Sequence, residues 1–310
     1  MSEDKEGGGG ASLLARAPGL PPALILLAGV AMGSAMDATI KHLSLTNHVL
    51  VVAFGRYLFG TLFSLGIWFH AGAPSISLEM WRAHGLRGAV IAACAVTFFW
   101  ALTVLPLAEA VTLSFIYPLL APFMAWLIIG ERIRPSNLAA ALVGFIGVFI
   151  ATRGAPPSAD SPLHTLGVVA VLTSATLFSV AVVLLRARAR TDGAAIVGLM
   201  TSVIPGLILA VPACFVLISA PPVLAAWPEF LLMGALAAGF MYLLAIAYAG
   251  AEAQQLAPIH YTELIWATLF GFIIFREQPR PEIFFGAVLI IAACIFVAWA
   301  DRRVTHLPTA

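Results

Sequence analysis

Charged side chains are scarce in this sequence, and their scarcity excludes a water-soluble fold. Asp, Glu, Lys and Arg make up 10% of the 310 residues, while 61% of the residues are hydrophobic. A soluble domain carries roughly 25% charged residues, because its surface must be covered by polar groups. The sequence therefore predicts a polytopic membrane protein. It has a formal net charge of +1 and no basic patch interleaved with aromatic residues, so nothing in it indicates nucleic-acid binding.

Cysteine is also rare, and catalytic motifs are missing. The three cysteines, Cys94, Cys214 and Cys294, fall within apolar runs and lack the spacing of a metal site or a disulfide framework. The sequence contains no P-loop, no nucleophile and base at catalytic spacing, and no dinucleotide-binding glycine pattern. We therefore expect neither an enzyme nor a bound cofactor or metal. Without a nucleotide-binding domain, transport would draw on a solute or proton gradient.

The N-terminus is polar and glycine-rich, and it lacks the basic n-region of a signal peptide. Residues 1–19 begin with MSEDKEGGGGAS, which cannot bury a core, and we expect a disordered cytoplasmic tail. The first apolar run, residues 22–43, is too long for a cleaved signal peptide, so we expect it to remain as a membrane span.

Long apolar runs are abundant. A helix needs about 20 apolar residues to cross a bilayer. Runs of this kind begin near residues 22, 48, 86, 109, 137, 164, 194, 227, 254 and 283. Stretches such as AALVGFIGVFIA (140–151) are apolar on every face, which favours helices over the alternating strands of a membrane β-barrel. We predict an all-α membrane protein of about ten transmembrane helices.

Lys and Arg residues predict the orientation of these helices. With the N-terminus inside, the inside segments hold eleven of them and the outside ends hold four, as the positive-inside rule requires. The eleven are Lys5, Arg16, Arg82, Arg87, Arg132, Arg134, Arg186, Arg188, Arg190, Arg302 and Arg303, and the four are Lys41, Arg153, Arg276 and Arg280. We predict a multi-pass protein of the bacterial inner membrane with both termini in the cytoplasm.

One connector occurs twice. GERIRP (130–135) follows the fourth predicted helix and REQPRP (276–281) follows the ninth, and both contain Glu-x-x-Arg-Pro. Because an odd number of helices separates them, the connectors lie at opposite faces of the membrane. This indicates an inverted repeat, which we place at residues 20–153 and 160–302. The simplest interpretation of each connector is structural, a charged stop followed by a helix-starting proline.

The repeats also resemble a known family. The resemblance is carried by LPLAEAVTLSFIYPLLAPFMAWLIIGERIRPSNLAAALVGFIGVFIATR (105–153) and LAPIHYTELIWATLFGFIIFREQPRPEIFFGAVLIIAACIFVAWADRR (256–303). These stretches are similar to the two EamA repeats of the drug/metabolite transporter superfamily. The resemblance covers nearly the whole chain and implies a ten-helix transporter with a central cavity. Members move amino acids, nucleoside derivatives, vitamins and other small metabolites, with the amino-acid exporters as the leading analogy.

Charges inside predicted spans are candidate site residues, because a charge in the bilayer is costly and usually functional. Asp37 and Lys41 lie one turn apart in the first helix. Arg56 lies in the second helix, without a matching cation in the seventh, and Glu109 opens the fourth. We expect these four side chains to neutralise one another near the outer mouth. They form either a structural network or substrate contacts, and the sequence does not decide between the two.

Glu263 lies near the middle of the ninth predicted helix, in PIHYTELIW (258–266), with His260 and Tyr261 beside it. A carboxylate at this depth can bind a substrate ammonium group or take up and release a proton. The structural alternative is a protonated Glu that is hydrogen-bonded to a neighbouring helix.

The fourth predicted helix carries a corresponding break in SFIYPLLAP (114–122). Pro118 and Pro122 free backbone carbonyls, which are tolerated in mid-membrane where they meet protein or a water-filled cavity. In the repeat alignment, Tyr117 corresponds to Glu263. We predict that both helices line a central cavity, with kinks for packing alone as the alternative.

Trp100 and Trp266 are the aromatic candidates for the wall of this cavity, since a site for an amphipathic metabolite combines aromatic rings with a few polar groups. Most aromatic residues of membrane proteins instead pack in the core or in the interfacial belts.

These features predict a secondary transporter that exports small metabolites, above all amino acids, by alternating access. Asp37 or Glu263 would meet the substrate ammonium, and Arg56 or a helix terminus the carboxylate. The predicted partners are a small-molecule substrate and membrane lipid, with proton coupling left open. One alternative is a carrier of a larger metabolite such as S-adenosylmethionine or riboflavin. Another is a non-transporting membrane protein, either a lipid flippase subunit or a scaffold.

Overall fold

The fold is known from a computed structural model that describes residues 21–130, 132–133, 135–152, 162–186, 192, 194–219, 226–250 and 259–305. The predicted disordered tail, residues 1–19, lies outside these ranges. Within them the regular structure is helical throughout and contains no strand, which confirms the predicted all-α class.

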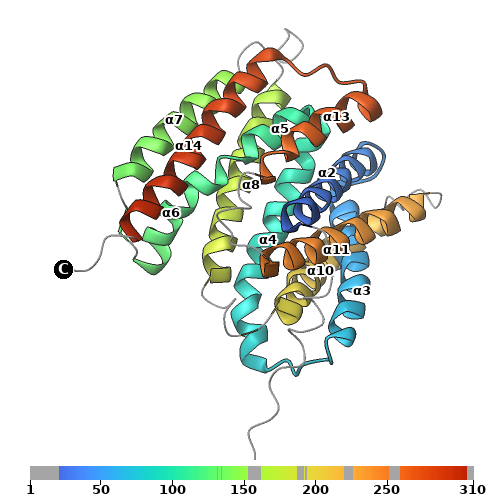
Figure 1. Cartoon of the computed structure of the whole chain (residues 1–310). Coiled ribbons are helices and arrows are strands. Elements are labelled where there is room, and N and C mark those ends of the chain that lie inside the picture. Colours follow the sequence, from blue (N-terminus) through green and yellow to red (C-terminus); the bar gives the residue numbers. More distant parts are fainter. Residues whose placement is uncertain are drawn as a thin grey trace, which may run out of the picture.

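Eleven described helices make ten spans (Figure 1). The first half forms α2 (Pro22–Thr46), α3 (Val49–His70), α4 (Leu78–Val104), α5 (Leu107–Ser114), α6 (Tyr117–Ile129) and α7 (Pro135–Thr152). The second half forms α8 (Pro162–Arg186), α10 (Ala194–Ser219), α11 (Trp227–Gly250), α13 (Glu263–Phe275) and α14 (Pro281–Thr305). α5 and α6 are two segments of one span. α4 begins earlier than the predicted residue 86, because the Ser77 hydroxyl caps its start by accepting from the Met80 amide at 3.2 Å.

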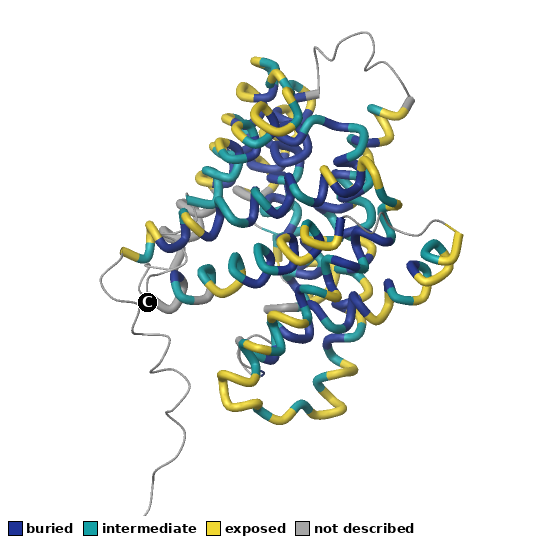
Figure 2. Tube along the Cα trace, turned by 90° about the vertical axis from the view of Figure 1, so that its right-hand side faces the viewer, coloured by how far each residue is buried: buried dark blue, intermediate teal, exposed yellow. Residues whose placement is uncertain are grey.

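The outside of the bundle is apolar, as a chain surrounded by lipid requires. Large hydrophobic side chains are exposed along the outer faces of the helices, with Phe215 at 72% and Ile218 at 85% (Figure 2). Six of the described helices, together with α5 and α6 counted as one span, are long and apolar enough to cross a membrane, and three shorter apolar helices accompany them. The chain is a multi-pass membrane protein.

The helices pack in pairs that follow an internal two-fold symmetry. The closest pairs are α2 with α11, α3 with α10, α4 with α8, and α7 with α14 (Figure 1). Each pair joins one helix of the first half to one of the second. In the repeat, α2 corresponds to α8 and α4 to α11. The α2–α11 pair is therefore equivalent to the α8–α4 pair, and each of the other two pairs is equivalent to itself. This is the arrangement that an inverted repeat produces.

Two helix breaks lie at equivalent positions near the centre of the bundle. α5 and α6 are separated by a turn at residues 115–116, and α13 follows a turn at residues 261–262. The two turns are 146 positions apart, the same offset that aligns the connectors. Their equivalent rings, Phe115 and Tyr261, touch edge to face with centroids 5.7 Å apart. The predicted break in each half is confirmed, and the symmetry axis passes close to this ring pair.

α7 and α14 approach each other closely because glycines face one another. A Cβ atom on Gly286 would lie 2.5 Å from the Gly147 carbonyl oxygen, and one on Gly147 would lie 2.8 Å from the Gly286 oxygen. Such small residues allow helix backbones to pack tightly in a membrane.

We expect Gly286→Leu to separate α7 from α14 and to destabilise the protein by about 1–3 kcal/mol, the usual cost of overpacking. The measurement is the melting temperature of the purified protein in detergent. The matched control is Gly66→Leu on α3, where an added Cβ would meet nothing within 4 Å. An equal loss in both variants would show that close packing at Gly286 is not the cause.

Candidate functional site

The two intramembrane carboxylates predicted from the sequence meet in one small pocket. Its volume is about 50 Å³, and it is lined by Val30, Gly33, Met36, Asp37, Phe240, His260 and Glu263. Asp37 comes from α2 in the first half and Glu263 from the start of α13 in the second, and the two carboxyl groups act on each other electrostatically. The pocket is therefore acidic and is shared between the two halves of the chain.

An aromatic ring completes this acidic pocket. The ring of Phe240 packs on Gly33 of α2, where an added Cβ would lie 3.5 Å from the ring. Carboxylates attract a cation, and the face of an aromatic ring adds to that attraction. Phe240 could not be identified from the sequence, because a phenylalanine within an apolar run of a membrane helix carries no signal of its own.

The helix break places Glu263 in this pocket. Glu263 is the first residue of α13, directly after the turn at residues 261–262, and its side chain lines the pocket. The Thr262 hydroxyl donates to the Ile259 carbonyl at 2.6 Å, and the Ser34 hydroxyl of α2 donates to the Glu263 carbonyl at 3.4 Å. The break thus orients the carboxylate and ties α13 to α2.

The size of the pocket limits what it holds in this conformation. One water molecule takes up about 30 Å³ of liquid. A pocket of about 50 Å³ has room for an ammonium group or one or two waters. A complete metabolite would require α2, α11 and α13 to move apart.

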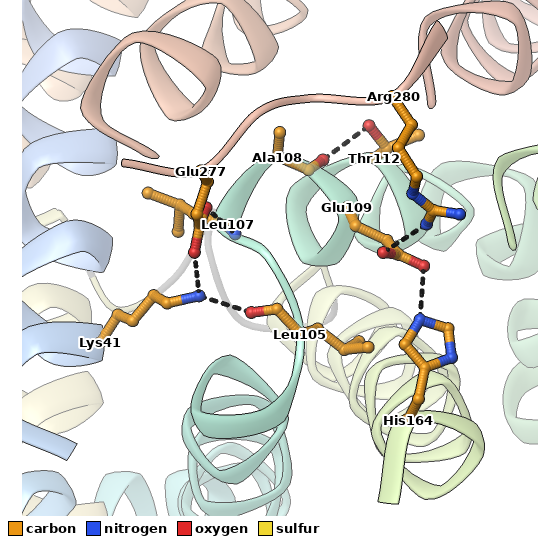
Figure 3. A network of polar contacts seen from close by, with 9 residues as sticks. All are labelled: Lys41, Leu105, Leu107, Ala108, Glu109, Thr112, His164, Glu277 and Arg280. Carbon is orange, nitrogen blue, oxygen red and sulfur yellow. Dashed lines mark hydrogen bonds and ion pairs between the residues drawn. The ribbon is translucent and has the colours of Figure 1, made fainter. Parts of the chain in front are cut away.

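A second polar cluster, the ionic network of Lys41, Glu109, His164, Glu277 and Arg280, lies at the end of the bundle where α2 ends (Figure 3). The Lys41 ammonium lies 2.6 Å from the Glu277 carboxylate and donates to the Leu105 carbonyl at 2.5 Å. Glu277 also accepts from the Leu107 amide at 2.8 Å. These contacts fasten the connector between α13 and α14 to the ends of α2 and α4 and to the start of α5.

The other half of the ionic network is centred on Glu109, whose side chain is fully buried. One Glu109 oxygen binds the Arg280 guanidinium at 2.8 Å, and the other lies 3.1 Å from Nε2 of His164 at the start of α8 (Figure 3). The connector and four helices are therefore held together at this end, which we call the Lys41 end.

The pairing expected among Asp37, Lys41, Arg56 and Glu109 is found only in part: Arg56 acts electrostatically on Asp37, and Glu109 on Lys41, but the close ion pairs of Lys41 and Glu109 are with other residues. Lys41 pairs with Glu277, Glu109 with Arg280 and His164, and Asp37 lies in the acidic pocket. The Arg56 guanidinium lies over the ring of Tyr57, 4.4 Å from its centroid. The second connector, predicted to be a helix stop, also supplies two charges of the ionic network. The repeated Glu-x-x-Arg-Pro pattern was the available signal that its charges have a further role.

The remaining candidates lie outside the acidic pocket. Trp100 lines a separate groove between α2, α3 and α4. Trp266 stacks on Phe270 and packs against the apolar cluster around Leu26. Tyr117 and Pro118 begin α6, and the Tyr117 ring packs edge to face against Phe178 at 4.9 Å. Among the predicted residues, the structure thus brings Asp37, His260 and Glu263 together.

Comparisons with known proteins agree on one family. Residues 20–153 and 165–299 each match the sequence profile of a family described as the EamA-like transporter family. Among similar curated proteins, a riboflavin transporter of Rhizobium johnstonii is 31% identical over 83% of both chains. An S-adenosylmethionine uptake transporter of Rickettsia bellii is 25% identical, covering 89% of this chain and 93% of its own length. The pseudopaline exporter CntI of Pseudomonas aeruginosa is 25% identical, covering 84% of this chain and 90% of its own length.

A solved crystal structure shares the fold. It superposes with a TM-score of 0.62 at 21% sequence identity, covering 91% of this chain and 98% of that chain. At this identity the match supports the helical architecture and carries nothing about the substrate.

Proposed function

This chain belongs to the EamA-like transporter family, and we propose that it exports small metabolites bearing a positively charged amino group, above all amino acids. The membrane would be the bacterial inner membrane, as the positive-inside pattern predicts. The names of the relatives include both uptake transporters and an exporter, so the direction rests on the sequence prediction alone.

The observation that carries this proposal is the pairing of Asp37 and Glu263 beside the ring of Phe240. Two carboxylates and an aromatic face inside the bilayer would bind a cation much better than an anion or a neutral group. The substrate ammonium would bind between the two carboxylates.

Arg56 is our candidate for the carboxylate end of an amino acid. Its guanidinium lies over the Tyr57 ring and is close enough to Asp37 to act on it electrostatically. A guanidinium presents a planar fork that matches a carboxylate in two hydrogen bonds. Asp37 and Arg56 would thus hold the two charged ends of a zwitterion.

We expect Arg56→Ala to weaken exchange of methionine while sparing exchange of methionine amide, which lacks the carboxylate. Loss of a charge-assisted hydrogen bond costs about 1.5–3 kcal/mol, so half-saturation for methionine should rise about tenfold or more. The measurement is the concentration dependence of counterflow for both compounds. An equal loss for both would remove Arg56 from the carboxylate-binding role.

Transport requires the ionic network to open in one of two alternating states. In the structure it holds the Lys41 end together, which the sequence predicts to be the outer end. When the substrate leaves, the two negative charges of Asp37 and Glu263 repel each other, and a proton shared between them would relieve that repulsion. Protons and substrate would therefore compete for the same site. Coupling to the proton gradient would follow from that competition.

S-adenosylmethionine is the second candidate substrate. It carries an amino-acid group and also a sulfonium cation, and both match an acidic pocket with an aromatic wall. Several relatives are named for its uptake. Riboflavin, named for other relatives, is uncharged and would draw little from paired carboxylates.

The test is counterflow in proteoliposomes that contain the full chain. Vesicles loaded with unlabelled threonine, methionine, phenylalanine, S-adenosylmethionine or riboflavin are given the same compound in labelled form. Exchange of several amino acids supports the proposal, and exchange of S-adenosylmethionine alone narrows it to the second candidate. Exchange of riboflavin alone would contradict the role given to the acidic pocket. If no compound is exchanged by protein whose melting transition shows that it is folded, the non-transporting alternatives are favoured.

A further inference from the structure

Buried polar side chains connect Arg56 to the start of α4, away from the Lys41 end. The Arg56 guanidinium lies 4.4 Å from the ring centroid of Tyr57, the next residue of α3. Arg87 of α4 acts electrostatically on the Tyr57 hydroxyl and lies 3.5 Å from Nδ1 of His84. Nε2 of His84 lies 3.0 Å from Asp192, just before α10. Tyr57, Arg87, His84 and Asp192 are all buried, so these contacts belong to the interior of the bundle.

The second half of the chain builds the equivalent contact from apolar residues. The offset of 146 that aligns the connectors pairs three of these polar side chains with apolar ones: Tyr57 with Val203, His84 with Phe230, and Arg87 with Met233. The ring of Phe230 packs closely on α3, where a Cβ added to Gly55 would lie 2.4 Å from it. Buried charges stabilise a fold no better than well-packed apolar side chains of similar volume. Packing alone therefore does not explain the polar version in the first half.

The Tyr57 ring is held by three helices. It belongs to α3 and is 3% exposed. On α10, a Cβ added to Gly206 would lie 3.3 Å from the Tyr57 Cβ, so the two backbones approach closely. On α4, Arg87 lies near the Tyr57 hydroxyl and is itself fixed, because it donates to the Thr201 hydroxyl of α10 at 3.0 Å. The ring thus gives the Arg56 guanidinium a rigid surface to lie on.

We propose that Tyr57 is a positioning residue, whose ring holds the Arg56 guanidinium where the carboxylate end of the substrate arrives. The inference rests on the proposed function and on the role given there to Arg56. The face of an aromatic ring attracts a guanidinium without using its N–H groups in an ion pair. Those N–H groups remain available for a substrate carboxylate. A carboxylate in the place of the ring would compete with the substrate for them.

The experiment removes the ring and measures counterflow of methionine and of methionine amide over a range of concentrations in proteoliposomes. In Tyr57→Leu, half-saturation for methionine should rise about fivefold or more, as expected for the loss of a buried contact between a cation and a ring. Half-saturation for methionine amide, which has no carboxylate, should stay unchanged. Tyr57→Phe keeps the ring and should restore half-saturation for methionine to the wild-type value.

A double variant and two controls complete the design. Adding Tyr57→Leu to Arg56→Ala should cause no loss beyond that of Arg56→Ala, because Tyr57 acts through Arg56. Tyr57→Met is made in parallel, so that the test does not depend on one variant, and a melting transition shows that each protein is folded. The matched control is Tyr242→Leu on α11, where the tyrosine is 44% exposed, and it should leave both compounds unaffected.

Equal losses for methionine and its amide in Tyr57→Leu would overturn the inference and make Tyr57 a packing residue. A loss in Tyr57→Phe as large as in Tyr57→Leu would overturn it too, as would a double variant that loses more than Arg56→Ala. Failure of the proposed function shows separately, in proteins whose Tyr57 is intact. If the wild-type protein exchanges neither compound, or if Arg56→Ala spares methionine, the role of Arg56 fails and that of Tyr57 falls with it.

Discussion

Glu263→Gln is expected to reduce the apparent affinity for amino compounds in counterflow by about thirtyfold or more, because loss of a buried charge partner costs about 2 kcal/mol or more. The substitution keeps the size and shape of the side chain and removes the charge from the acidic pocket that also contains Asp37. The measurement is the concentration dependence of exchange with the variant in proteoliposomes.

The matched control is Glu229→Gln, since Glu229 lies at the start of α11 with 44% of its side chain exposed. It should leave exchange unchanged. Asp37→Asn should lower the apparent affinity about as much as Glu263→Gln does. In the double variant, the fold-loss of affinity should be smaller than the product of the two single fold-losses, because both carboxylates would bind one ammonium. Unchanged affinity and flux in Glu263→Gln would remove the acidic pocket from the substrate path.

The spans and the repeat could be predicted from the sequence because their causes are local. Apolar length determines whether a segment crosses the bilayer, and the Lys and Arg bias predicts its direction. The helix breaks were predictable for the same reason. The stretches SFIYPLLAP and PIHYTELIW overlap in the repeat alignment, with Tyr117 opposite Glu263, and the turns at 115–116 and 261–262 lie within them.

Partner choice in the ionic network could not be predicted, because it depends on which helix ends the fold brings together. Lys41 and Glu277 are more than two hundred residues apart in sequence, and the nearer Asp37 was the natural partner for Lys41 on a helical spacing rule. The sequence indicates only the depth of each charge in the membrane. That was sufficient to find Asp37 and Glu263 and insufficient to pair Lys41 or Glu109. Phe240 was missed because phenylalanine is common in apolar helices.

Glu277→Gln is expected to open the Lys41 end. The amide oxygen can still accept from the Leu107 amide, while the Lys41 ammonium loses its charge partner in a site where its side chain is only 7% exposed. Removing one partner of a buried ion pair costs about 3–5 kcal/mol, and this cost falls on the closed arrangement, since Lys41 is hydrated once the end opens. The equilibrium should therefore shift toward opening by about a hundredfold or more.

A thiol at Met36 in the acidic pocket measures this shift. Met36→Cys is introduced into a chain in which Cys94, Cys214 and Cys294 are replaced by alanine, and whole cells are treated with a membrane-impermeant maleimide. Glu277→Gln should raise the labelling rate steeply. Adding Lys41→Met should lower it again, because the unpaired ammonium is then gone and an apolar side chain suits the closed site. As a control, Glu282→Gln in the first turn of α14 should have no effect on the labelling rate.

If Lys41→Met failed to reverse the opening, or if Glu282→Gln caused it equally, closure would not depend on the Lys41–Glu277 pair. The Lys41 end would then be held by helix packing, and the acidic pocket would reach the outside by another route.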